Sequence, residues 1–410
     1  MVSWAFLLVC LVGAWLVWNV YHPLDGRFSA GPSFVLGWLT GELGIHHIFW
    51  QAVATVAFVA AGALEAWPGR IGLGLAFASW AALGLHYLRG FEAQGAMERA
   101  LDEALGPDHP AMPAEVAWGP LLRPFPIRAP GVERTKNVVY GRAAAQELKL
   151  DLYRPRGTAA GAALPVFFYV HGGGWVMGSK SAQGLPIVNH LAGKGWLCVN
   201  VNYRLSPGAT FPDHLVDLKR ALHWVRNEGV AYGADPGFVA VAGGSAGGHL
   251  AALLALTPNE PEYQPGFEDT DTTVQAAVPI FGVYDFVEPG RTWGHDDLGP
   301  FLERQVMKTT WAEDPKAFEK ASPLHRIGPD APPFFVVHGA ADTLVPAREA
   351  REFVKAFREH AKAPIGYAEI PGAQHAFDQF PSLRSQITRC GIEIFLEEIR
   401  RRHRKGESGD

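Results

Sequence analysis

Three long apolar stretches fill most of the first 90 residues of the chain. Residues 2–20 and 71–88 contain no charged side chain, and residues 45–67 contain a single glutamate near their end. Each stretch is about as long as the hydrocarbon core of a bilayer requires, and tryptophan and tyrosine gather near the stretch ends, as they do at membrane interfaces. The pattern predicts a membrane region over residues 1–90 with about three transmembrane helices. A buried helical hairpin of a soluble protein is the alternative.

The polar segments between these stretches indicate an orientation. Pro68-Gly69-Arg70 predicts a tight turn, so that the second and third stretches form a helical hairpin. With three spans, Arg27, Arg89 and Arg99 lie on one side of the membrane and Arg70 lies on the other. Because cytoplasmic segments carry the excess of Lys and Arg, the chain is expected to be an integral membrane protein, with a leaning towards a cytoplasmic carboxyl-terminal part.

Residues 91–131 connect this region to the rest of the chain. Residues 91–105 are polar and predict a juxtamembrane helix, and seven prolines follow between Pro107 and Pro130. Such a proline-rich segment favours an extended, semi-rigid linker. A new domain is therefore expected to begin near Val132.

The remainder of the chain, residues 132–404, alternates between strand-like and helix-like patterns. Continuous apolar runs such as 166–170 are typical of buried parallel strands, and amphipathic segments such as 213–227 are typical of the helices that cover them. The alternation predicts an α/β domain with a mostly parallel sheet and helices on both faces. Residues 286–330 are longer than a tight connection requires and are a candidate cap insertion.

The motif that organises this domain is Gly243-Gly244-Ser245-Ala246-Gly247. It follows the apolar run 238–242 and precedes a helical pattern that begins near His249. A serine at a sharp strand-to-helix turn is the arrangement of a nucleophile elbow, in which Cβ atoms on the flanking residues would collide with the neighbouring strand and helix. The helix N-terminus behind Ser245 also favours negative charge. A glycine-rich turn with an incidental serine is the alternative.

A second glycine-rich motif, His171-Gly172-Gly173-Gly174-Trp175, follows the apolar run 166–170 directly. Consecutive glycines leave backbone N–H groups free to point into a site. The N–H groups of Gly173, Gly174 and Ala246 are therefore expected to form an oxyanion hole, in which one donor typically contributes ~3–4 kcal/mol in the transition state. A flexible loop is the alternative.

Two further residues complete a catalytic arrangement with Ser245. Asp342 follows one late strand-like run, and His375 lies between the last strand-like run and the last helix. His375 is expected to be the general base for the serine, and Asp342 to orient the imidazole and stabilise it when protonated. Asp285 is the second choice for the acid, and Asp378 is interpreted as a loop or helix-start residue.

Composition excludes several other classes of function. The net charge is −5 and the isoelectric point is about 6.3, so no basic field is present to attract nucleic acid. The three cysteines, Cys10, Cys198 and Cys390, show no spacing that indicates a zinc site, a redox motif or a disulfide framework. Neither a metal nor a cofactor is expected.

Several segments carry a resemblance to a known family. They are Leu150-Asp151-Leu152-Tyr153-Arg154-Pro155, His171-Gly172-Gly173-Gly174-Trp175, Val201-Asn202-Tyr203-Arg204-Leu205, Gly243-Gly244-Ser245-Ala246-Gly247-Gly248-His249-Leu250, and the loops of Asp342 and His375. With these segments, residues 147–395 resemble the hormone-sensitive-lipase-like esterases and lipases, a carboxylesterase group of the α/β-hydrolases.

The resemblance implies an α/β-hydrolase fold after the amino-terminal membrane region. It implies Ser245, Asp342 and His375 as the catalytic triad, and an oxyanion hole formed by the three residues named above. Gly244 stands where many members have an acidic residue. That departure favours the subset similar to bacterial carboxylesterases, feruloyl-type esterases and arylformamidases.

The expected function is that of a membrane-anchored serine esterase or lipase, which hydrolyses carboxylic esters through an acyl-enzyme on Ser245. The expected partners are a small to medium lipophilic ester and membrane lipid. The same triad would serve an amidase, an arylformamidase or an acyltransferase. A non-catalytic interaction protein on a hydrolase scaffold is a further alternative.

Overall fold

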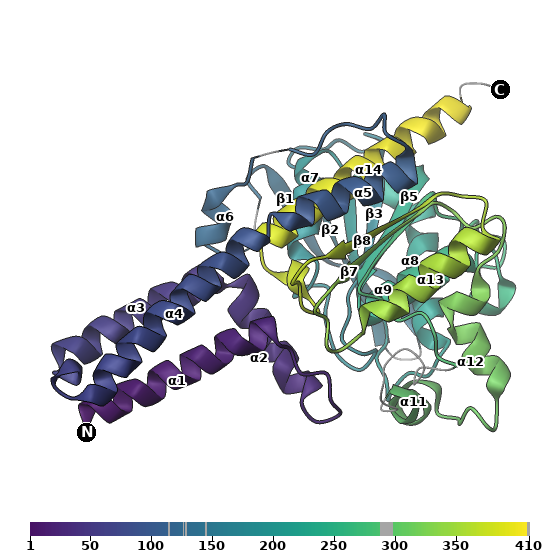
Figure 1. Cartoon of the computed structure of the whole chain (residues 1–410). Coiled ribbons are helices and arrows are strands. Elements are labelled where there is room, and N and C mark those ends of the chain that lie inside the picture. Colours follow the sequence, from purple (N-terminus) through teal and green to yellow (C-terminus); the bar gives the residue numbers. More distant parts are fainter. Residues whose placement is uncertain (114, 126, 128, 144–145, 288–297, 408–410) are drawn as a thin grey trace.

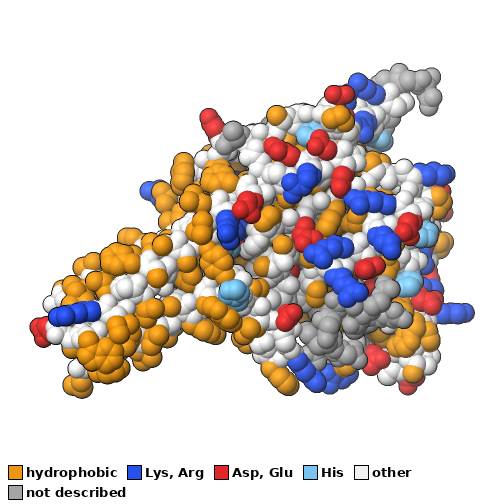
Figure 2. Space-filling view, in the orientation of Figure 1, with side chains coloured by type: hydrophobic (Ala, Val, Ile, Leu, Met, Phe, Trp, Pro, Cys, Tyr) orange, Lys and Arg blue, Asp and Glu red, His pale blue; other side chains and the backbone are white. Residues whose placement is uncertain are grey.

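An arm of apolar helices projects from a larger body that is built around one sheet (Figure 1). The computed structural model of the chain describes residues 1–113, 115–125, 127, 129–143, 146–287 and 298–407. Apolar side chains cover most of the visible surface of the arm, whereas charged side chains are frequent on the visible face of the body (Figure 2).

The sheet of the body has eight strands in the order β1-β2-β4-β3-β5-β6-β7-β8. The strands are β1 (Val132–Ala143), β2 (Gln146–Pro155), β3 (Leu164–Val170), β4 (Leu197–Val201), β5 (Ala234–Gly244), β6 (Ala276–Ile280), β7 (Phe334–Gly339) and β8 (Ile365–Ile370). The pairs β1–β2 and β2–β4 are antiparallel, and the other neighbours are parallel. The predicted mostly parallel sheet is confirmed, and the carboxyl ends of β3, β5, β6, β7 and β8 meet at one edge.

Two layers of helices cover the two faces of the sheet. One layer consists of α8 (Asp213–Asn227), α9 (Ala246–Leu256) and α13 (Ala347–His360). The other consists of α5 (Glu92–Leu105), α7 (Leu185–Gly193) and α14 (Leu383–Glu407). Strand side chains alternate between the two cores, so Phe168 of β3 faces the first layer while Phe167 and Tyr169 face the second.

Helix α5 is more closely integrated into the body than the sequence suggested. The predicted juxtamembrane helix is present, but its buried side chains, among them Ala93, Met97 and Leu101, share a core with β8 and α14. The proline-rich residues that follow contain the short helix α6 (Trp118–Leu122). The helical layer of the body therefore begins at Glu92, upstream of the boundary expected near Val132.

The arm consists of α1 (Val2–Tyr21), α2 (Ala30–Glu42), α3 (Gly44–Ala60) and α4 (Trp67–Arg89). Two helical stretches are long and apolar enough to cross a membrane: α1, and the run from Trp67 to Leu105 that α4 and α5 form. Helices α2 and α3 pass the same test only together, and they are bent by 86° against each other, so the described residues hold up to three candidate spans. Helix α2 was not expected from the sequence.

The turn between the last two arm helices lies earlier than expected. Helix α3 ends at Ala60, and a 3-10 turn at Ala63–Glu65 leads into α4. The predicted turn at residues 68–70 is wrong, because Pro68 lies in the first turn of α4, where a proline loses no helical hydrogen bond. The chain turns instead at Gly62, which has a φ of +83°.

The candidate cap, residues 286–330, is described only in part, since residues 288–297 lie outside the described residues. Its described remainder contains α11 (Leu298–Phe301), a π-helical segment at Leu302–Met307, α12 (Pro315–Ala321) and a 3-10 turn at Pro323–Arg326. The Phe301 ring of α11 would lie 3.8 Å from a Cβ on Gly174. This segment therefore approaches the second glycine motif, and its role as a cap stays a prediction.

Backbone segments approach each other closely where β5 turns into α9. A Cβ on Gly247 would lie 2.1 Å from the carbonyl oxygen of Val170, and a Cβ on Gly243 would lie 2.4 Å from the carbonyl oxygen of Gly247. Real Cβ atoms do not come this close to backbone oxygen. The absence of side chains at these two positions therefore allows α9 to begin directly against the end of β3.

We predict that Gly247→Ala destabilises the body by at least about 2 kcal/mol, because its methyl group would be forced into backbone carbonyl groups that have no room to move. The loss of stability is measured as a lower denaturant midpoint of the full chain in detergent, with unfolding followed by tryptophan fluorescence. Gly328→Ala is the matched control, since a Cβ there meets nothing within 4 Å. Equal midpoints for the two variants would contradict the packing argument.

Candidate active site

Ser245 lies at the sharp turn between β5 and α9. Its φ of +58° and ψ of −123° are strained for a residue with a side chain. The turn is held by its backbone, since the N–H of Ser245 donates to the carbonyl oxygen of Ile280 at 2.9 Å and its carbonyl accepts from His249 N at 3.0 Å. Ser245 is partly exposed while Gly244 and Ala246 beside it are buried. The turn thus leaves the Ser245 side chain partly accessible, between two buried neighbours.

The second glycine motif lies directly against this serine. A Cβ on Gly172 would be 2.5 Å from the carbonyl oxygen of Gly244 and 3.0 Å from the Cβ of Ser245. Gly173 and Gly174 follow with φ values of +115° and +59°. Among the described residues no protein acceptor takes the N–H groups of Gly173 and Gly174. Both donors are therefore available beside the serine, as an oxyanion hole requires.

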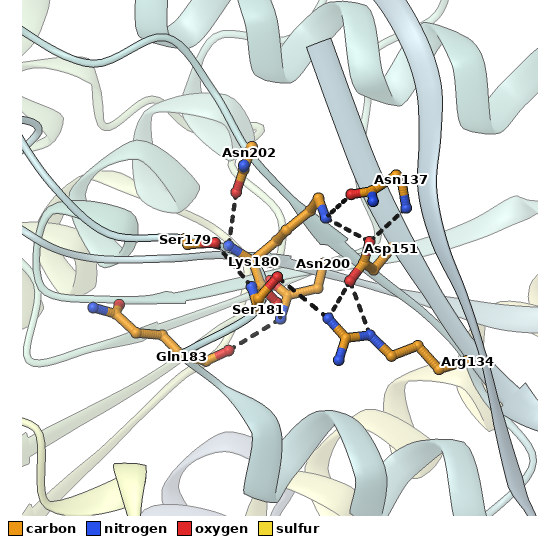
Figure 3. A network of polar contacts seen from close by, with 9 residues as sticks. All are labelled: Arg134, Asn137, Asp151, Ser179, Lys180, Ser181, Gln183, Asn200 and Asn202. Atoms are coloured by element: carbon orange, nitrogen blue, oxygen red, sulfur yellow. Dashed lines mark hydrogen bonds and ion pairs between the residues drawn. The ribbon is translucent and has the colours of Figure 1, made fainter.

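Side chains from outside the motif position this loop. The Oε1 atom of Gln183 accepts from the N–H of Gly172 at 2.6 Å. Asn200 of β4 donates from Nδ2 to the carbonyl oxygens of Lys180 at 2.9 Å and Gln183 at 3.0 Å, and Asn202 Oδ1 accepts from Lys180 N at 2.7 Å. Polar side chains at the end of β4 thus hold the segment that supports the glycine loop (Figure 3).

Lys180 also belongs to a buried cluster of charges beside β2 (Figure 3). Asp151 accepts from Lys180 Nζ at 2.6 Å, from Arg134 Nε at 2.9 Å and from Asn137 N at 2.8 Å. Burial would raise the pKa of Asp151, but these hydrogen bonds outweigh it and hold the pKa below its ordinary value. The carboxylate therefore stays charged and ties the glycine-loop segment to the sheet.

Asp342 and His375 are hydrogen bonded to each other. His375 Nδ1 lies 2.6 Å from Asp342 Oδ2, while Asp342 Oδ1 accepts from Leu344 N at 2.9 Å and Val345 N at 2.8 Å. Burial would raise the pKa of Asp342, but His375 and His338 outweigh it and lower the pKa to about 2. An ionised carboxylate at Nδ1 leaves Nε2 of His375 as the atom that can accept a proton.

Phe281, directly after β6, packs against both the imidazole of His375 and Gly244 of the elbow. Its ring centroid lies 4.6 Å from that of His375, and a Cβ on Gly244 would lie 2.8 Å from the same ring. The strands that lead to the glycine loop, the serine and the histidine are β3, β5 and β8, whose carboxyl ends share one edge of the sheet. The structure therefore brings the predicted site residues to one edge.

The other carboxylates considered in the sequence have different surroundings. Asp285 Oδ1 accepts from Val287 N at 2.8 Å and lies 3.7 Å from His325 Nε2. Asp378 lies in a short 3-10 helix, Phe377–Gln379, and burial raises its pKa to about 6. The carboxylate at His375 Nδ1 is that of Asp342.

Two other histidines near the glycine motifs are structural. Burial lowers the pKa of His171 to about 4 and that of His249 to about 3, so both rings are neutral at physiological pH. His171 stacks on Tyr203 with ring centroids 4.5 Å apart. His249 accepts from Trp175 Nε1 at 3.1 Å, and its Nε2 lies 2.7 Å from the carbonyl oxygen of Ala321.

Two residues at the site were missed by the sequence analysis. Gln374 Oε1 accepts from Thr343 N at 2.8 Å and from His375 N at 2.9 Å, so it joins the loop of Asp342 to the loop of His375. The Phe34 ring of α2 lies 5.7 Å from the His375 ring, edge to face. Gln374 stood beside His375 in the sequence, but nothing there linked a helix of the arm to this loop.

In the described ranges, no group of three or more His, Cys, Asp or Glu side chains is arranged to hold a metal ion.

The sequence matches a known family over half of its length. The BD-FAE family model matches residues 150–357. The chain belongs to the BD-FAE family. The range starts in β2 and ends in α13, so it includes the glycine loop, the elbow and Asp342.

Named relatives agree with this family. A probable carboxylic ester hydrolase of Mycobacterium tuberculosis, LipM, is 40% identical, covering 96% of this chain and 93% of that protein. Esterase LipQ of the same organism is 38% identical, and the match covers 90% of this chain and 84% of LipQ. The solved structure of a propionate-bound Thermogutta terrifontis esterase is 29% identical with a TM-score of 0.50, covering 61% of this chain and 86% of that one. The BD-FAE protein described here is thus a carboxylic ester hydrolase with an α/β-hydrolase fold, and the resemblance to hormone-sensitive-lipase-like esterases is confirmed.

We predict that Asp342→Asn lowers kcat of this BD-FAE esterase by roughly 10⁴-fold, because an amide at Nδ1 favours the wrong tautomer of the base. Hydrolysis of p-nitrophenyl acetate by the full chain in detergent measures the loss. Asp285→Asn is the matched control and keeps kcat within a few-fold. A loss in Asp285→Asn with activity retained in Asp342→Asn would assign the acid to Asp285 instead.

We also predict that Asp151→Asn lowers the free energy of unfolding by ~3–5 kcal/mol at pH 7, because it leaves the Lys180 ammonium buried beside a neutral group. The folded carboxyl has a lowered pKa, so its stabilisation is complete above the ordinary value of about 4 and is lost as pH falls further. The difference between variant and wild type should therefore shrink below about pH 4 in denaturant titrations.

Glu147→Gln is the control for this cluster. The Glu147–Lys149 ion pair, 3.0 Å long, is solvent-exposed and screened, so its loss should leave the free energy of unfolding nearly unchanged. If the change in the free energy of unfolding caused by Asp151→Asn does not depend on pH, the variant has lost packing rather than the interaction of the charged carboxylate.

Proposed function

We propose that this esterase cleaves its ester through a covalent acyl-enzyme on Ser245, with His375 as general base and Asp342 as its orienting acid. The observation that carries the proposal is the 2.6 Å contact between Asp342 and His375 Nδ1, beside a partly exposed serine at a strained turn. A serine hydroxyl is a weak nucleophile until a neighbouring base takes its proton.

The proposed reaction has two halves. Ser245 Oγ attacks the ester carbonyl carbon while its proton passes to His375 Nε2, and the alcohol leaves with that proton. Water then attacks the acyl-enzyme, gives its proton to the same nitrogen, and releases the acid as the proton returns to Ser245. Both tetrahedral intermediates place a negative oxygen near Ser245. The N–H groups of Gly173, Gly174 and Ala246 are proposed to bind it.

The low pKa of Asp342 supports this assignment of roles. A carboxyl with a pKa of about 2 is ionised throughout the range in which an esterase works. It therefore stabilises the imidazolium that forms when His375 takes the serine proton, without taking that proton itself.

We further propose that the arm anchors the enzyme in a membrane. Helix α1 is 20 residues long, and both it and the run from Trp67 to Leu105 are long and apolar enough to cross a bilayer. Large apolar side chains point outward from the arm, among them Trp4, Leu8, Val12, Val56 and Phe77. A face of this size left in water would aggregate, whereas in a bilayer it needs no protein partner.

The expected result for the nucleophile is that a fluorophosphonate probe labels the full chain at Ser245 and that Ser245→Ala abolishes both labelling and p-nitrophenyl acetate hydrolysis. Labelling is read by intact mass and by the modified peptide. Ser29→Ala is the control serine; its hydroxyl bonds the Gly26 carbonyl at 3.2 Å, and the variant should label and turn over like wild type.

Hydrolysis that survives Ser245→Ala, or a probe adduct on another residue, would refute the assigned nucleophile. Carbonate extraction of membranes is the second measurement: the full chain should stay in the membrane pellet if the arm is inserted.

A further inference from the structure

Helix α2 of the arm lies against the loops that carry the proposed acid and base. Besides the edge-to-face contact of Phe34 with His375, the Oγ1 atom of Thr343 donates to the carbonyl oxygen of Ala30 at 3.1 Å. Gly37 also lies near these loops, since a Cβ there would be in van der Waals contact with Nε2 of Gln374, at 3.8 Å. The arm therefore reaches both loops of the site, beside β8 where it joins the body (Figure 1).

The position of α2 is set by the helices proposed to span the membrane. Asn19 near the end of α1 makes two hydrogen bonds with Ser33: Nδ2 donates to the Ser33 carbonyl at 2.9 Å, and Oδ1 accepts from Ser33 Oγ at 2.7 Å. Tyr21 of α1 donates to the carbonyl oxygen of Ala82 in α4 at 2.7 Å. The end of α1, the end of α4 and the start of α2 are thus held together.

The far end of α2 is joined to the body by buried charges. Arg384 Nη1 lies 3.5 Å from Glu42 Oε1 with both side chains nearly inaccessible, and Arg384 Nη2 donates to the carbonyl oxygen of His86 at 3.3 Å. A buried pair of this kind tolerates little displacement, because separating the charges leaves each one desolvated and alone. Helix α2 is therefore fixed to the body at both of its ends.

A row of aromatic rings leads away from His375 along α2. The ring of Phe34 stacks on Trp38 at 5.6 Å, Trp38 stacks on Phe380 at 4.9 Å, and Phe125 meets Phe380 edge to face at 5.5 Å. Phe125 is 63% exposed at the end of this row. The row joins the proposed base to an apolar surface at the root of the arm.

The opposite side of α2 faces outward. Val35 is 44% exposed and Phe28, just before the helix, is 87% exposed. If α1 crosses the bilayer, the chain leaves the membrane at Tyr21, and α2 begins only a short segment later. Helix α2 then lies at the membrane surface with one face on the base loop and the other towards lipid.

We propose that α2 forms a wall of the ester site, that Phe34 is its specificity-determining residue, and that the substrate is an ester with a long apolar chain taken from the bilayer. The proposal rests on the proposed function of Ser245 and His375. The aromatic rings of this row would bind an acyl or alkyl chain through apolar contact. A short water-soluble ester gains nothing from them.

The test compares two esters on the full chain reconstituted in phosphatidylcholine nanodiscs. The probes are p-nitrophenyl acetate and p-nitrophenyl laurate, and the readout is the ratio of their kcat/KM values. Phe34→Ala should lower the laurate-to-acetate ratio about tenfold, the size of effect that loss of apolar contact in a substrate pocket produces. Phe34→Leu should give a smaller loss of the ratio, since it keeps part of the contact.

Val35→Ala is the matched control, because it removes an apolar side chain from the adjacent, outward position of the same helix; its ratio should stay within about twofold of wild type. An unchanged ratio in Phe34→Ala would overturn the proposal, as would an equal loss for both esters in Phe34→Ala and Phe34→Leu. Fluorophosphonate labelling of each variant separates failure of the proposed function from failure of the proposed role of α2. If the wild type is neither labelled nor able to hydrolyse p-nitrophenyl acetate, the proposed function is refuted. If Phe34→Ala is labelled but its laurate-to-acetate ratio is unchanged, only the role of α2 is refuted.

Discussion

The site depends on how closely backbone segments approach at the carboxyl edge of the sheet. The end of β3, the end of β5 and the first turn of α9 are so near each other that a Cβ at Gly172, Gly243 or Gly247 would overlap a carbonyl oxygen. This approach places the glycine loop against Ser245. The strained backbone of Ser245 costs of order 1–3 kcal/mol, which the fully buried core on both sides of β5 offsets. A looser turn would release the strain and also separate the serine from the loop.

Two buried carboxylates hold in place groups that lie beside the glycine-rich turns. Asp151 holds the segment that supports the glycine loop, and Asp342 holds the imidazole of His375. Burial would raise the pKa of both. Hydrogen bonds outweigh it at Asp151, and the charge interaction with His375 together with hydrogen bonds outweighs it at Asp342, so both have a lowered pKa. The same principle thus serves two different purposes: one carboxylate positions donors for the proposed oxyanion, and the other orients the proposed base.

Local patterns predicted much of the fold, because they report local physics. Apolar runs indicated strands, the glycines around Ser245 indicated a sharp turn, and Asp342 and His375 each followed a strand. What the sequence did not show depends on contacts between distant segments. The support of Gly172 by Gln183 and the contact of Phe34 with His375 join residues that share no periodicity or motif.

The boundary near Val132 illustrates the same limit. Proline-rich residues 107–130 resemble a linker in composition, yet α5 lies before them and supplies buried side chains to the core over β8 and α14. Removing everything upstream of Val132 would expose that core, including Phe335 and Phe395, which stack with centroids 4.9 Å apart beneath it. The prolines instead carry the chain from α5 on one side of the body to the start of β1.

The arm contacts the body through two of its helical connections near the site. Helix α5 continues almost directly from α4, so part of the layer that covers β8 belongs to the same helical run as a candidate membrane span. Helix α2 meets the same region from the other side through Glu42 and Arg384. A tilt of the helices proposed to span the membrane would therefore displace elements that adjoin the loops after β7 and β8, where Asp342 and His375 lie. A flexible tether would leave His375 unaffected by the position of the arm. Here α5 packs on β8 and Glu42 pairs with Arg384 of α14, the two elements that flank the His375 loop in the chain.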